Sequence, residues 1–282
     1  MKVAVASGKG GTGKTTIATN LAHLAAGEGR SVAYLDCGVE EPNGHIFLKP
    51  EVDRQQPIFK LVPEIDDQAC THCGQCATSC RFGAIASLPE RTIVFDDLCH
   101  GCGGCTLACP VGAIREVQRP IGELRSGHSG DVLFCEGRLD VGEAMSPPAV
   151  SAVKRAAPAA ELSVFDAPPG TSCPVVETLR GSDVVLLVTE PTPFGLHDLR
   201  LAVEMVRAMR LPCAVVVNRA DAGNGEVRAY CAREGLPIWC EIPDDRTVAE
   251  TYSRGQLVCD VAPVFRDRIA ELLHCLDLEG RP

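Results

Sequence analysis

Gly8-Lys9-Gly10-Gly11-Thr12-Gly13-Lys14-Thr15-Thr16 is the stretch of this 282-residue chain that decides its fold. It satisfies the pattern G-x4-G-K-S/T and lies between a predicted apolar strand, Lys2–Ala6, and a predicted helix, Lys14–Ala26. Because glycines let the backbone turn tightly, successive N–H groups and the helix N-terminus can converge on phosphate oxygens. A glycine turn that merely starts a helix is the alternative, but the strand-to-helix context favours a nucleotide site.

The side chains of this loop have distinct expected tasks. Lys14 would neutralise charge on the β- and γ-phosphates, and Thr15 would offer its hydroxyl to Mg²⁺. The loop residues expected to contact a nucleotide are Gly8, Gly10, Gly11, Thr12, Gly13, Lys14, Thr15 and Thr16. Nucleotide binding is therefore the first function that the sequence predicts.

Apolar strands and helices alternate on both sides of a cysteine-rich middle segment. Strands that are almost continuously apolar are typical of a parallel sheet covered by helices on both faces. After the first strand, the predicted strands are Ser31–Asp36, Leu162–Asp166, Asp183–Thr189, Cys213–Asn218 and Pro237–Ile242, with a further candidate at Asp131–Glu136. The later predicted helices are Ala149–Ala156, Leu196–Met209, Glu226–Glu234 and Val264–Leu276. The expected fold class is α/β, with a doubly wound, mostly parallel sheet.

Eight of the sixteen cysteines form two copies of C-x2-C-x2-C-x3-C, which is the spacing of bacterial ferredoxins. The copies are Cys70, Cys73, Cys76 and Cys80, and Cys99, Cys102, Cys105 and Cys109. Three thiolates of one run can hold one cubane, while the fourth serves the other cluster. The expected ligand sets are Cys70, Cys73 and Cys76 with Cys109, and Cys99, Cys102 and Cys105 with Cys80. A zinc site is the alternative, but zinc sites usually close with two separated pairs of ligands.

These cysteines divide the chain. We expect a small α+β ferredoxin-like domain with two [4Fe-4S] clusters at 63–118, inserted into one α/β domain whose parts are 1–62 and 119–282. Two neighbouring cubanes with no open ligand position favour electron transfer over substrate chemistry.

The second lysine of the phosphate-binding loop narrows the family. The run KGGTGKTT, which starts at Lys9, resembles the deviant Walker A motif of the MinD, ParA, Mrp and nitrogenase-iron-protein class of P-loop ATPases. The resemblance implies an ATP-dependent dimer in which Lys9 reaches the nucleotide site of the partner subunit. A solvated loop lysine is the alternative. Lys9, Lys14 and Asp166 are the catalytic residues that the resemblance implies.

Further motifs of that class follow in the same order. The run LSVFD, which ends at Asp166, and the APPG that follows it, which ends at Gly170, resemble switch II. This implies that Asp166 holds Mg²⁺ through water and that the Gly170 N–H senses the γ-phosphate. Asn218 matches the position of an adenine contact, and Pro243 lies in a run that resembles the loop over the base. A turn-forming role is the alternative for Asn218.

One position departs from that class. After the second strand the class has D-x-D, whose second aspartate assists hydrolysis, whereas here the run is Asp36-Cys37-Gly38. Asp36 is still expected in the nucleotide site, but glycine cannot orient water. Glu40 and Glu41 are close enough in sequence to substitute, and a flexible acidic loop is the alternative. The sequence therefore predicts ATP binding and leaves hydrolysis open.

Eight cysteines lie outside the two repeats and form no C-x2-C. Several are in apolar strands, where cysteine behaves as a small hydrophobe. Cys173 follows switch II, which in relatives faces the dimer interface, so two copies could meet there and hold a bridging cluster. A core or helix-start cysteine is the alternative.

Charge and composition exclude several functions. The net charge is −10 and aromatic residues make up 4% of the chain, so the basic and stacking surfaces that bind nucleic acid are not expected. No apolar run is long enough to span a membrane, and the N-terminus lacks a signal-peptide pattern. We expect a cytoplasmic protein with neither nucleic-acid nor membrane partners.

The resemblance covers nearly the whole chain and implies a P-loop ATPase with an inserted ferredoxin domain. The leading hypothesis is an ATP-gated electron-transfer protein that binds ATP, Mg²⁺ and two [4Fe-4S] clusters. It would act as a homodimer, or as a heterodimer with a related ATPase, and pass electrons to a redox protein. The alternatives are an iron–sulfur cluster carrier or assembly ATPase similar to Mrp, and a redox-sensing positioning ATPase of the MinD and ParA type.

Gly38 generates the first testable prediction. If this glycine disables hydrolysis, steady-state phosphate release by the anaerobic protein should be near background. The Gly38→Asp variant should raise it by about tenfold or more, because a positioned carboxylate can orient the attacking water. Gly38→Asn is the matched control of equal size without the charge. Fast turnover in the parent protein would contradict the prediction.

Overall fold

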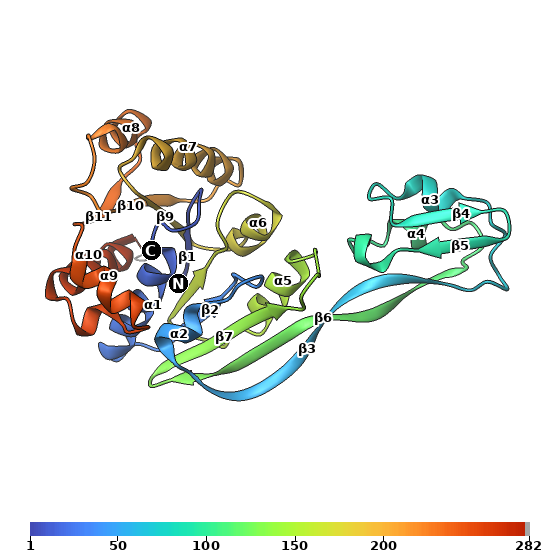
Figure 1. The fold of residues 1–282 in the computed structure, drawn as a ribbon, viewed down its shortest axis with the longest axis horizontal. Helices are drawn as coiled ribbons and strands as arrows, with labels where there is room; N and C mark the ends of the chain where they lie inside the picture. The colour runs from blue at the N-terminus through green and yellow to red at the C-terminus, as the bar shows by residue number, and fades with distance from the viewer. Residues whose placement is uncertain (280–282) are drawn as a thin grey trace.

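The structure is a computed structural model that describes residues 1–279. Within them the central element is a nine-stranded sheet with the order β11-β10-β9-β1-β8-β2-β7-β6-β3 (Figure 1). Its strands are β1 (Lys2–Ala6), β2 (Val32–Asp36), β3 (Glu51–Ile65), β6 (Ile114–Ser129), β7 (Val132–Leu139), β8 (Leu162–Asp166), β9 (Val184–Thr189), β10 (Cys213–Asn218) and β11 (Ile238–Ile242). All neighbours from β11 to β7 are parallel, and only β6 runs antiparallel to β7 and to β3. The predicted α/β fold is confirmed.

Helices cover both faces of the sheet, and each face has its own apolar core. On one face the core is formed with α1 (Lys14–Gly27), the 3₁₀ turn η2 (Val258–Asp260) and α10 (Pro263–Glu279). On the other face it is formed with α5 (Pro147–Arg155), α6 (Cys173–Leu179), α7 (Pro193–Ala208) and α8 (Glu226–Glu234). Two short helices, α2 (Gly44–Leu48) and α9 (Arg246–Ser253), follow β2 and β11. This is the doubly wound arrangement that the apolar strands indicate.

Most predicted elements keep their bounds to within a few residues. The strand Lys2–Ala6 and the helix Glu226–Glu234 are unchanged. The helix α7 begins at Pro193, three residues before the predicted start, because the Thr192 hydroxyl caps it by accepting the Gly195 N–H at 3.0 Å. Proline is well tolerated in the first turn, where its missing N–H has no helical partner.

Strands β3 and β6 are much longer than any element predicted between the two halves of the sheet. They pair from Glu51 with His128 to Ile65 with Ile114, but only residues 122–129 of β6 also pair with β7. Residues 59–65 and 114–121 therefore form a free two-stranded ribbon, which we call the arm. Prolines at 57, 63 and 120 obscure these strands in the sequence; an exposed ribbon tolerates them because one edge of each strand needs no N–H donor.

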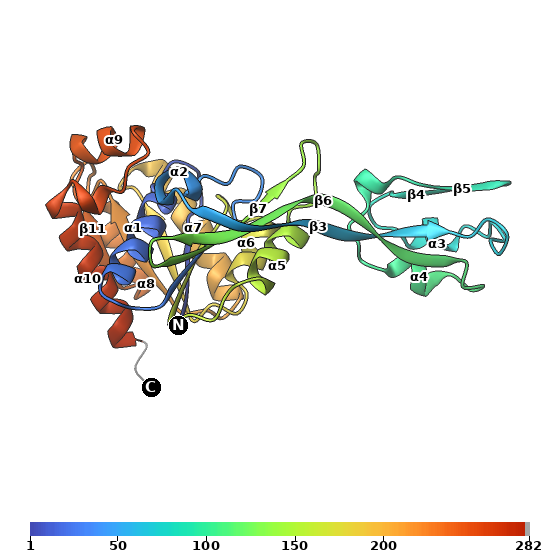
Figure 2. The ribbon, with the colours of Figure 1, turned by 90° about the horizontal axis from the view of Figure 1, so that it is seen from below.

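The arm carries the cysteine-rich segment, residues 66–113, which we call the cysteine module. It contains α3 (Gln75–Ser79), β4 (Ile85–Leu88), β5 (Arg91–Val94), the 3₁₀ turn η1 (Asp96–Leu98) and α4 (Gly104–Ala108). Figures 1 and 2 show this module at the far end of β3 and β6, apart from the helices of the main sheet. The proposed limits of the inserted domain, 63 and 118, fall inside these two strands.

The sheet brings the predicted nucleotide residues to one edge. The phosphate-binding loop follows β1, which lies between β8 and β9. Asp36, Asp166 and Asn218 end β2, β8 and β10, and Pro243 follows β11. Because parallel strands end at the same edge, residues far apart in sequence meet above the loop. In residues 1–279 no helix is long and apolar enough to cross a bilayer.

A buried ion pair fastens the arm to the main sheet. Lys60 of β3 donates from Nζ to Glu143 Oε1 at 2.8 Å, and their side chains are 0% and 5% exposed. Glu143 lies between β7 and α5, and Arg119 of β6 approaches its other oxygen at 3.8 Å. Removing one member of a buried pair leaves the other charge desolvated, which costs more than the pair itself contributes.

We therefore expect Lys60→Met to lower the free energy of unfolding by about 3 kcal/mol. The matched control is Arg115→Met, because Arg115 pairs with Glu64 on the exposed arm, with side chains 77% and 49% exposed. That variant should change stability by less than about 1 kcal/mol. Urea unfolding of the anaerobic, reduced protein measures both, and equal effects of the two substitutions would contradict the assignment.

Candidate functional site

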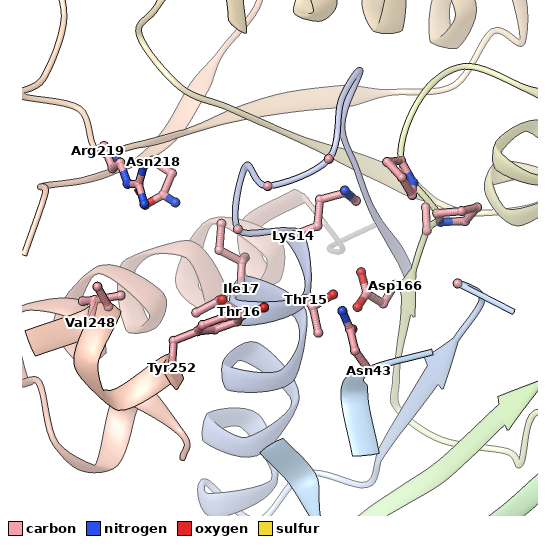
Figure 3. Close-up of a pocket in the computed structure, with 18 of the residues that line it drawn as sticks. Lys14, Thr15, Thr16, Ile17, Asn43, Asp166, Asn218, Arg219, Val248 and Tyr252 are labelled. Carbon is pink, nitrogen blue, oxygen red and sulfur yellow. Dashed lines mark hydrogen bonds between the residues drawn. The ribbon is translucent and has the colours of Figure 1, made fainter. Parts of the chain in front are cut away.

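A cavity of about 670 Å³ opens above the phosphate-binding loop. Ten of the predicted site residues line it: Gly10, Gly11, Gly13, Lys14, Thr15, Thr16, Asp36, Asp166, Asn218 and Pro243. Gly8, Lys9, Thr12 and Gly170 are not among the described residues that line it. Its volume is within the range of pockets that bind nucleotide-sized ligands. Figure 3 shows the lining side chains converging from the strand ends on the start of α1.

Two glycines of the loop occupy places that no side chain could share. A Cβ on Gly8 would lie 2.2 Å from the Asp198 carbonyl oxygen. Gly13 has φ +95°, and its Cβ would lie 2.6 Å from Asn218 Nδ2. Asn218 in turn donates from Nδ2 to the Thr12 carbonyl at 2.9 Å. The residue predicted to contact adenine thus also braces the phosphate-binding loop.

Lys14 and Thr15 begin α1 beside the carboxylate of Asp166 (Figure 3). Lys14 is 7% exposed, and burial lowers the pKa of its ammonium group, while nearby Asp166 opposes this shift. Within residues 1–279 its Nζ makes one hydrogen bond, to the Lys9 carbonyl at 3.4 Å. A buried cation with so little compensation favours an anionic ligand, as the phosphate-binding prediction requires.

Asp36 and Asp166 face each other at the ends of neighbouring strands. They are register partners of β2 and β8, and each is 2% exposed. Burial, and then the charge of Asp166, raise the pKa of Asp36 to about 7. Burial also raises the pKa of Asp166, against the influence of Thr15 and Lys14. Two desolvated carboxylates side by side favour retention of a proton until a cation neutralises them.

The two carboxylates differ in their hydrogen bonds. Asp36 uses both oxygens: Oδ1 accepts the Gly38 N–H at 2.9 Å, and Oδ2 accepts those of Asn43 at 3.1 Å and Gly44 at 2.9 Å. Asp166 Oδ2 accepts the Tyr34 hydroxyl at 2.9 Å. Its Oδ1 is buried and has no hydrogen-bond partner within residues 1–279. This oxygen beside the Thr15 hydroxyl is a donor set that fits Mg²⁺.

Lys9 is held within its own subunit. Its Nζ lies 3.4 Å from Glu190 Oε2, and Arg219 approaches the other oxygen of Glu190 at 3.2 Å. Gly170 is also engaged, because its N–H donates to the Ser7 carbonyl at 3.0 Å. Both residues would have to leave these partners to take the roles that the sequence predicts for them.

The cavity has further lining residues that sequence reasoning did not identify as site residues. Arg219 follows Asn218 in a left-handed conformation, with φ +53°. Tyr252 and Val248 extend from α9 into the end of the cavity opposite Lys14 (Figure 3). The hydrogen bond from Tyr34 to Asp166 could not be predicted from the sequence, because Tyr34 lies inside an apolar strand. Glu40 and Glu41, the suggested substitutes for a switch I aspartate, do line the cavity.

Two smaller cavities lie in the cysteine module, and each is lined by four repeat cysteines. One is lined by Cys70, Cys73, Cys76 and Cys109. The other is lined by Cys80, Cys99, Cys102 and Cys105. Each cavity therefore takes three cysteines from one repeat and the last cysteine from the other. These are the two sets that the ferredoxin spacing predicts.

The fit of these cavities to a cubane depends on how a cubane is held. Among the described residues no group of three or more His, Cys, Asp or Glu side chains converges closely enough to hold one metal ion. A [4Fe-4S] cluster does not need such convergence, because each of four thiolates binds a different iron atom. Backbone N–H groups already point at the sulfurs, from Ala84 to Cys80 and from Ala113 to Cys109, both at 3.3 Å.

The raised pKa of Asp36 generates a prediction for the protein without nucleotide or Mg²⁺. An unfolded aspartate ionises near pH 4, whereas folded Asp36 ionises near pH 7. The folded state therefore binds the proton more tightly, and this site loses stability as the pH rises from about 4 to about 7. The loss should amount to at most about 4 kcal/mol.

Asp36→Asn should remove this component, so the stability of the variant relative to the parent should increase between pH 5 and pH 8. Thermal unfolding across that range measures the difference. Asp267→Asn, which changes an exposed carboxyl group on α10, is the matched control. A constant difference between Asp36→Asn and the parent at all pH values would contradict the assignment.

Comparison with known proteins shows relatives along the whole chain. MJ0578 of Methanocaldococcus jannaschii is 34% identical over 98% of this chain and 96% of its own length. MJ0579 of the same organism is 30% identical over 91% and 90%. An iron-sulfur cluster carrier protein of Pyrococcus abyssi is 26% identical over 90% of this chain and 77% of its own length.

The fold also matches known structures. The septum site-determining protein MinD of Pyrococcus horikoshii, complexed with Mg-ADP, superposes with a TM-score of 0.61 over 99% of this chain and 97% of its own, at 17% identity. At that identity the likeness shows the fold. Residues 3–258 match the family described as the CobQ/CobB/MinD/ParA nucleotide binding domain. With its phosphate-binding loop, paired carboxylates and parallel sheet, the chain belongs to this CobQ/CobB/MinD/ParA family.

Proposed function

We propose that this protein is an ATP-binding iron–sulfur protein in which ATP and Mg²⁺ control electron transfer through two [4Fe-4S] clusters. The observation that carries the proposal is the pair of four-cysteine cavities at the end of an arm that grows from the nucleotide-binding sheet. The mixed membership of the two cavities supports two cubanes in particular, because it follows the exchange of the fourth ligand in two-cluster ferredoxins.

At the nucleotide end, each side chain has a physical task. The loop N–H groups and the Lys14 ammonium bind the β- and γ-phosphates. The Thr15 hydroxyl and Asp166 Oδ1 would hold the Mg²⁺ shell, the latter because it is buried without a partner in the described chain. The lining residues near Asn218 and Pro243 form the proposed base site. Mg²⁺ with ATP would draw the proton off the Asp36–Asp166 pair.

At the other end, the cysteine module would hold the clusters. Cys70, Cys73, Cys76 and Cys109 would bind one, and Cys80, Cys99, Cys102 and Cys105 the other. When bound, such clusters accept and release single electrons. Several apolar side chains of the module are exposed, including Leu107 at 90%, which fits a surface for a redox protein partner.

The proposed active form is a dimer. Lys9 pairs with Glu190 in the single chain, so the trans role requires this ion pair to break as a second ATPase subunit approaches. Val141 and Phe194 are exposed at 107% and 77%, and Cys173 is exposed at the start of α6. Because Methanocaldococcus jannaschii has two different full-length relatives, the partner can be a related chain as well as a copy.

A second candidate function is iron–sulfur cluster delivery. It is favoured by the relatives from three Pyrococcus species that are named iron-sulfur cluster carrier protein, at 24–26% identity. A carrier would release an intact cluster to an acceptor, whereas a relay would retain its clusters and pass electrons. Cys76 and Cys99 are enclosed, at 9% and 8% exposed, which favours retention, whereas exposed Cys73 and Cys102 would suit release.

The proposal predicts cluster content and its response to ATP. The anaerobic protein should contain about eight iron and eight sulfide atoms per chain. Addition of ATP with Mg²⁺ should shift the potential of at least one cluster by about 60 mV, a tenfold change for one electron. Iron and sulfide analysis measures the cluster content. Redox titration followed by electron paramagnetic resonance measures the potential of each cluster. An unchanged potential, together with transfer of intact cluster to an apo-acceptor, would favour the carrier instead.

Two matched variants test the ligand sets in the same experiment. Cys109→Ser should disturb the cluster of Cys70, Cys73 and Cys76, and Cys80→Ser should disturb the other one. Cys135→Ser changes a buried cysteine of β7 and is the control. If Cys109→Ser and Cys80→Ser altered the same signal, the exchange of fourth ligands would be wrong.

A further inference from the structure

Charged side chains form a row across four neighbouring strands, from the nucleotide cavity to the strand that leads into the arm. Asp166 of β8 is the register partner of Asp36 of β2, and Asp36 is the register partner of Glu136 of β7. Glu136 is the register partner of Arg125 of β6. Register partners lie directly beside each other on the same face of a sheet. The row therefore joins the predicted magnesium ligand to β6.

Glu136 is the central member of this row. It is 0% exposed, which is exceptional for a glutamate that lies outside the described lining of the nucleotide cavity. Its Oε1 accepts from Arg125 Nη1 at 2.7 Å, and its Oε2 lies 3.0 Å from His45 Nδ1. Arg125 Nε is buried and has no partner in the described chain. The charge of Glu136 also raises the pKa of Asp36.

The segment between β2 and α2 is held by two members of the row. Asp36 accepts the N–H groups of Gly38, Asn43 and Gly44, which fixes the start of α2. Glu136 holds His45, one residue further along the same helix. Gly38 and Asn43 also line the nucleotide cavity. A ligand that draws Asp36 toward a cation would therefore loosen one anchor of this segment and leave Glu136 as the other.

Arg125 connects the same carboxylate to the arm. It lies on the part of β6 that pairs with both β7 and β3, four residues after the end of the free ribbon at 121. A buried carboxylate held by an arginine and a histidine responds strongly to a change of charge at its neighbour, because the local dielectric screens the interaction weakly. A change at Asp36 thus acts on the Glu136–Arg125 bond and on the base of the arm.

We propose that Glu136 is a positioning residue that couples the nucleotide site to the arm, through Asp36 and His45 on one side and Arg125 on the other. The proposal rests on the proposed function, since it supplies the route by which ATP would reach the cysteine module. The structure corresponds to the state in which Asp36 is bound to backbone N–H groups. In the second state Asp36 faces the cation site, the segment 37–44 moves, and the His45–Glu136–Arg125 contacts rearrange with it.

Hydrogen exchange of the full anaerobic protein tests this coupling directly. With ATP and Mg²⁺, exchange of backbone amides in 119–129 should change by about fivefold or more relative to nucleotide-free protein. Glu136→Gln and Arg125→Gln should each abolish this change while ATP still binds. The double variant should lose no more than either single variant, because the two residues act as one unit.

The controls separate coupling from general damage. Glu64→Gln removes a carboxylate from the exposed arm pair with Arg115, and it should keep the full response to ATP. If Glu136→Gln does not fold, His45→Asn provides the second variant, since the His45 side chain is 37% exposed and its loss leaves the Glu136–Arg125 bond in place. His45→Asn should weaken the response in 119–129 without changing the iron content.

The outcomes distinguish this inference from the proposed function. Folded Glu136→Gln or Arg125→Gln protein with the parent's exchange response would overturn the coupling role, and so would a parent protein without any response. If the parent shows the exchange response but no shift in cluster potential, the coupling stands and the electron-transfer function fails. If the potential shift survives in Glu136→Gln, the function stands and this route fails.

Discussion

Two carboxylates buried side by side at the ends of β2 and β8 impose the constraint on which the site depends. Asp36 and Asp166 are each 2% exposed, and within residues 1–279 no arginine or lysine donates a hydrogen bond to either carboxylate. Such a pair is costly when both members are ionised. Backbone N–H groups, the Tyr34 hydroxyl and a retained proton reduce that cost without a ligand. A divalent cation would remove it, which is why the pair fits the Mg²⁺ site of the proposed function.

The arm holds the cysteine module away from the helices of the main sheet (Figures 1 and 2). Its two strands continue the β3–β6 pairing of the main sheet, with a register shift at Ile58 and Phe59, so the cysteine module is attached by two covalent chains and their hydrogen bonds. Lys60 and Glu143 fasten its root inside the protein. A tilt or twist at the base of this ribbon would move the module at its far end, because both strands of the ribbon begin in the main sheet. The proposed control of the cysteine module by ATP needs such a connection between the module and the main sheet.

Relatives and fold neighbours each cover nearly the whole chain but describe different properties of the molecule. The matched family accounts for a nucleotide binding domain, and the MinD structure accounts for the fold of the sheet. The Pyrococcus carriers connect the same family with iron–sulfur chemistry, and relatives in Methanocaldococcus jannaschii match nearly the full length. The cysteine cavities add what those names do not state: four thiols in each of two separate places. Together these observations support the proposal that ATP binding and cluster chemistry are coupled in this protein.

The sequence by itself determined the elements whose signal is local. The G-x4-G-K-T loop, the apolar strands and the two cysteine repeats each depend on spacing within one short segment, and the structure places them in a parallel sheet and a separate module. The exchange of Cys80 and Cys109 between the two clusters stays a prediction from the ferredoxin spacing, and the mixed lining of the two cysteine cavities supports it. The long strands β3 and β6 escaped prediction, since their prolines and mixed polarity conceal an edge ribbon.

Only the tertiary structure decided which distant residues share a site. Tyr34 reaches Asp166, Asn218 braces Thr12, Lys9 turns to Glu190, and Glu136 joins His45 to Arg125. No local pattern marks these pairs, because their partners are brought together by strand order and register. A polar residue inside an apolar strand has no visible role until the neighbouring strand is known. Sequence spacing can therefore identify a loop or a repeat, whereas the pairing of buried charges is a property of the assembled sheet.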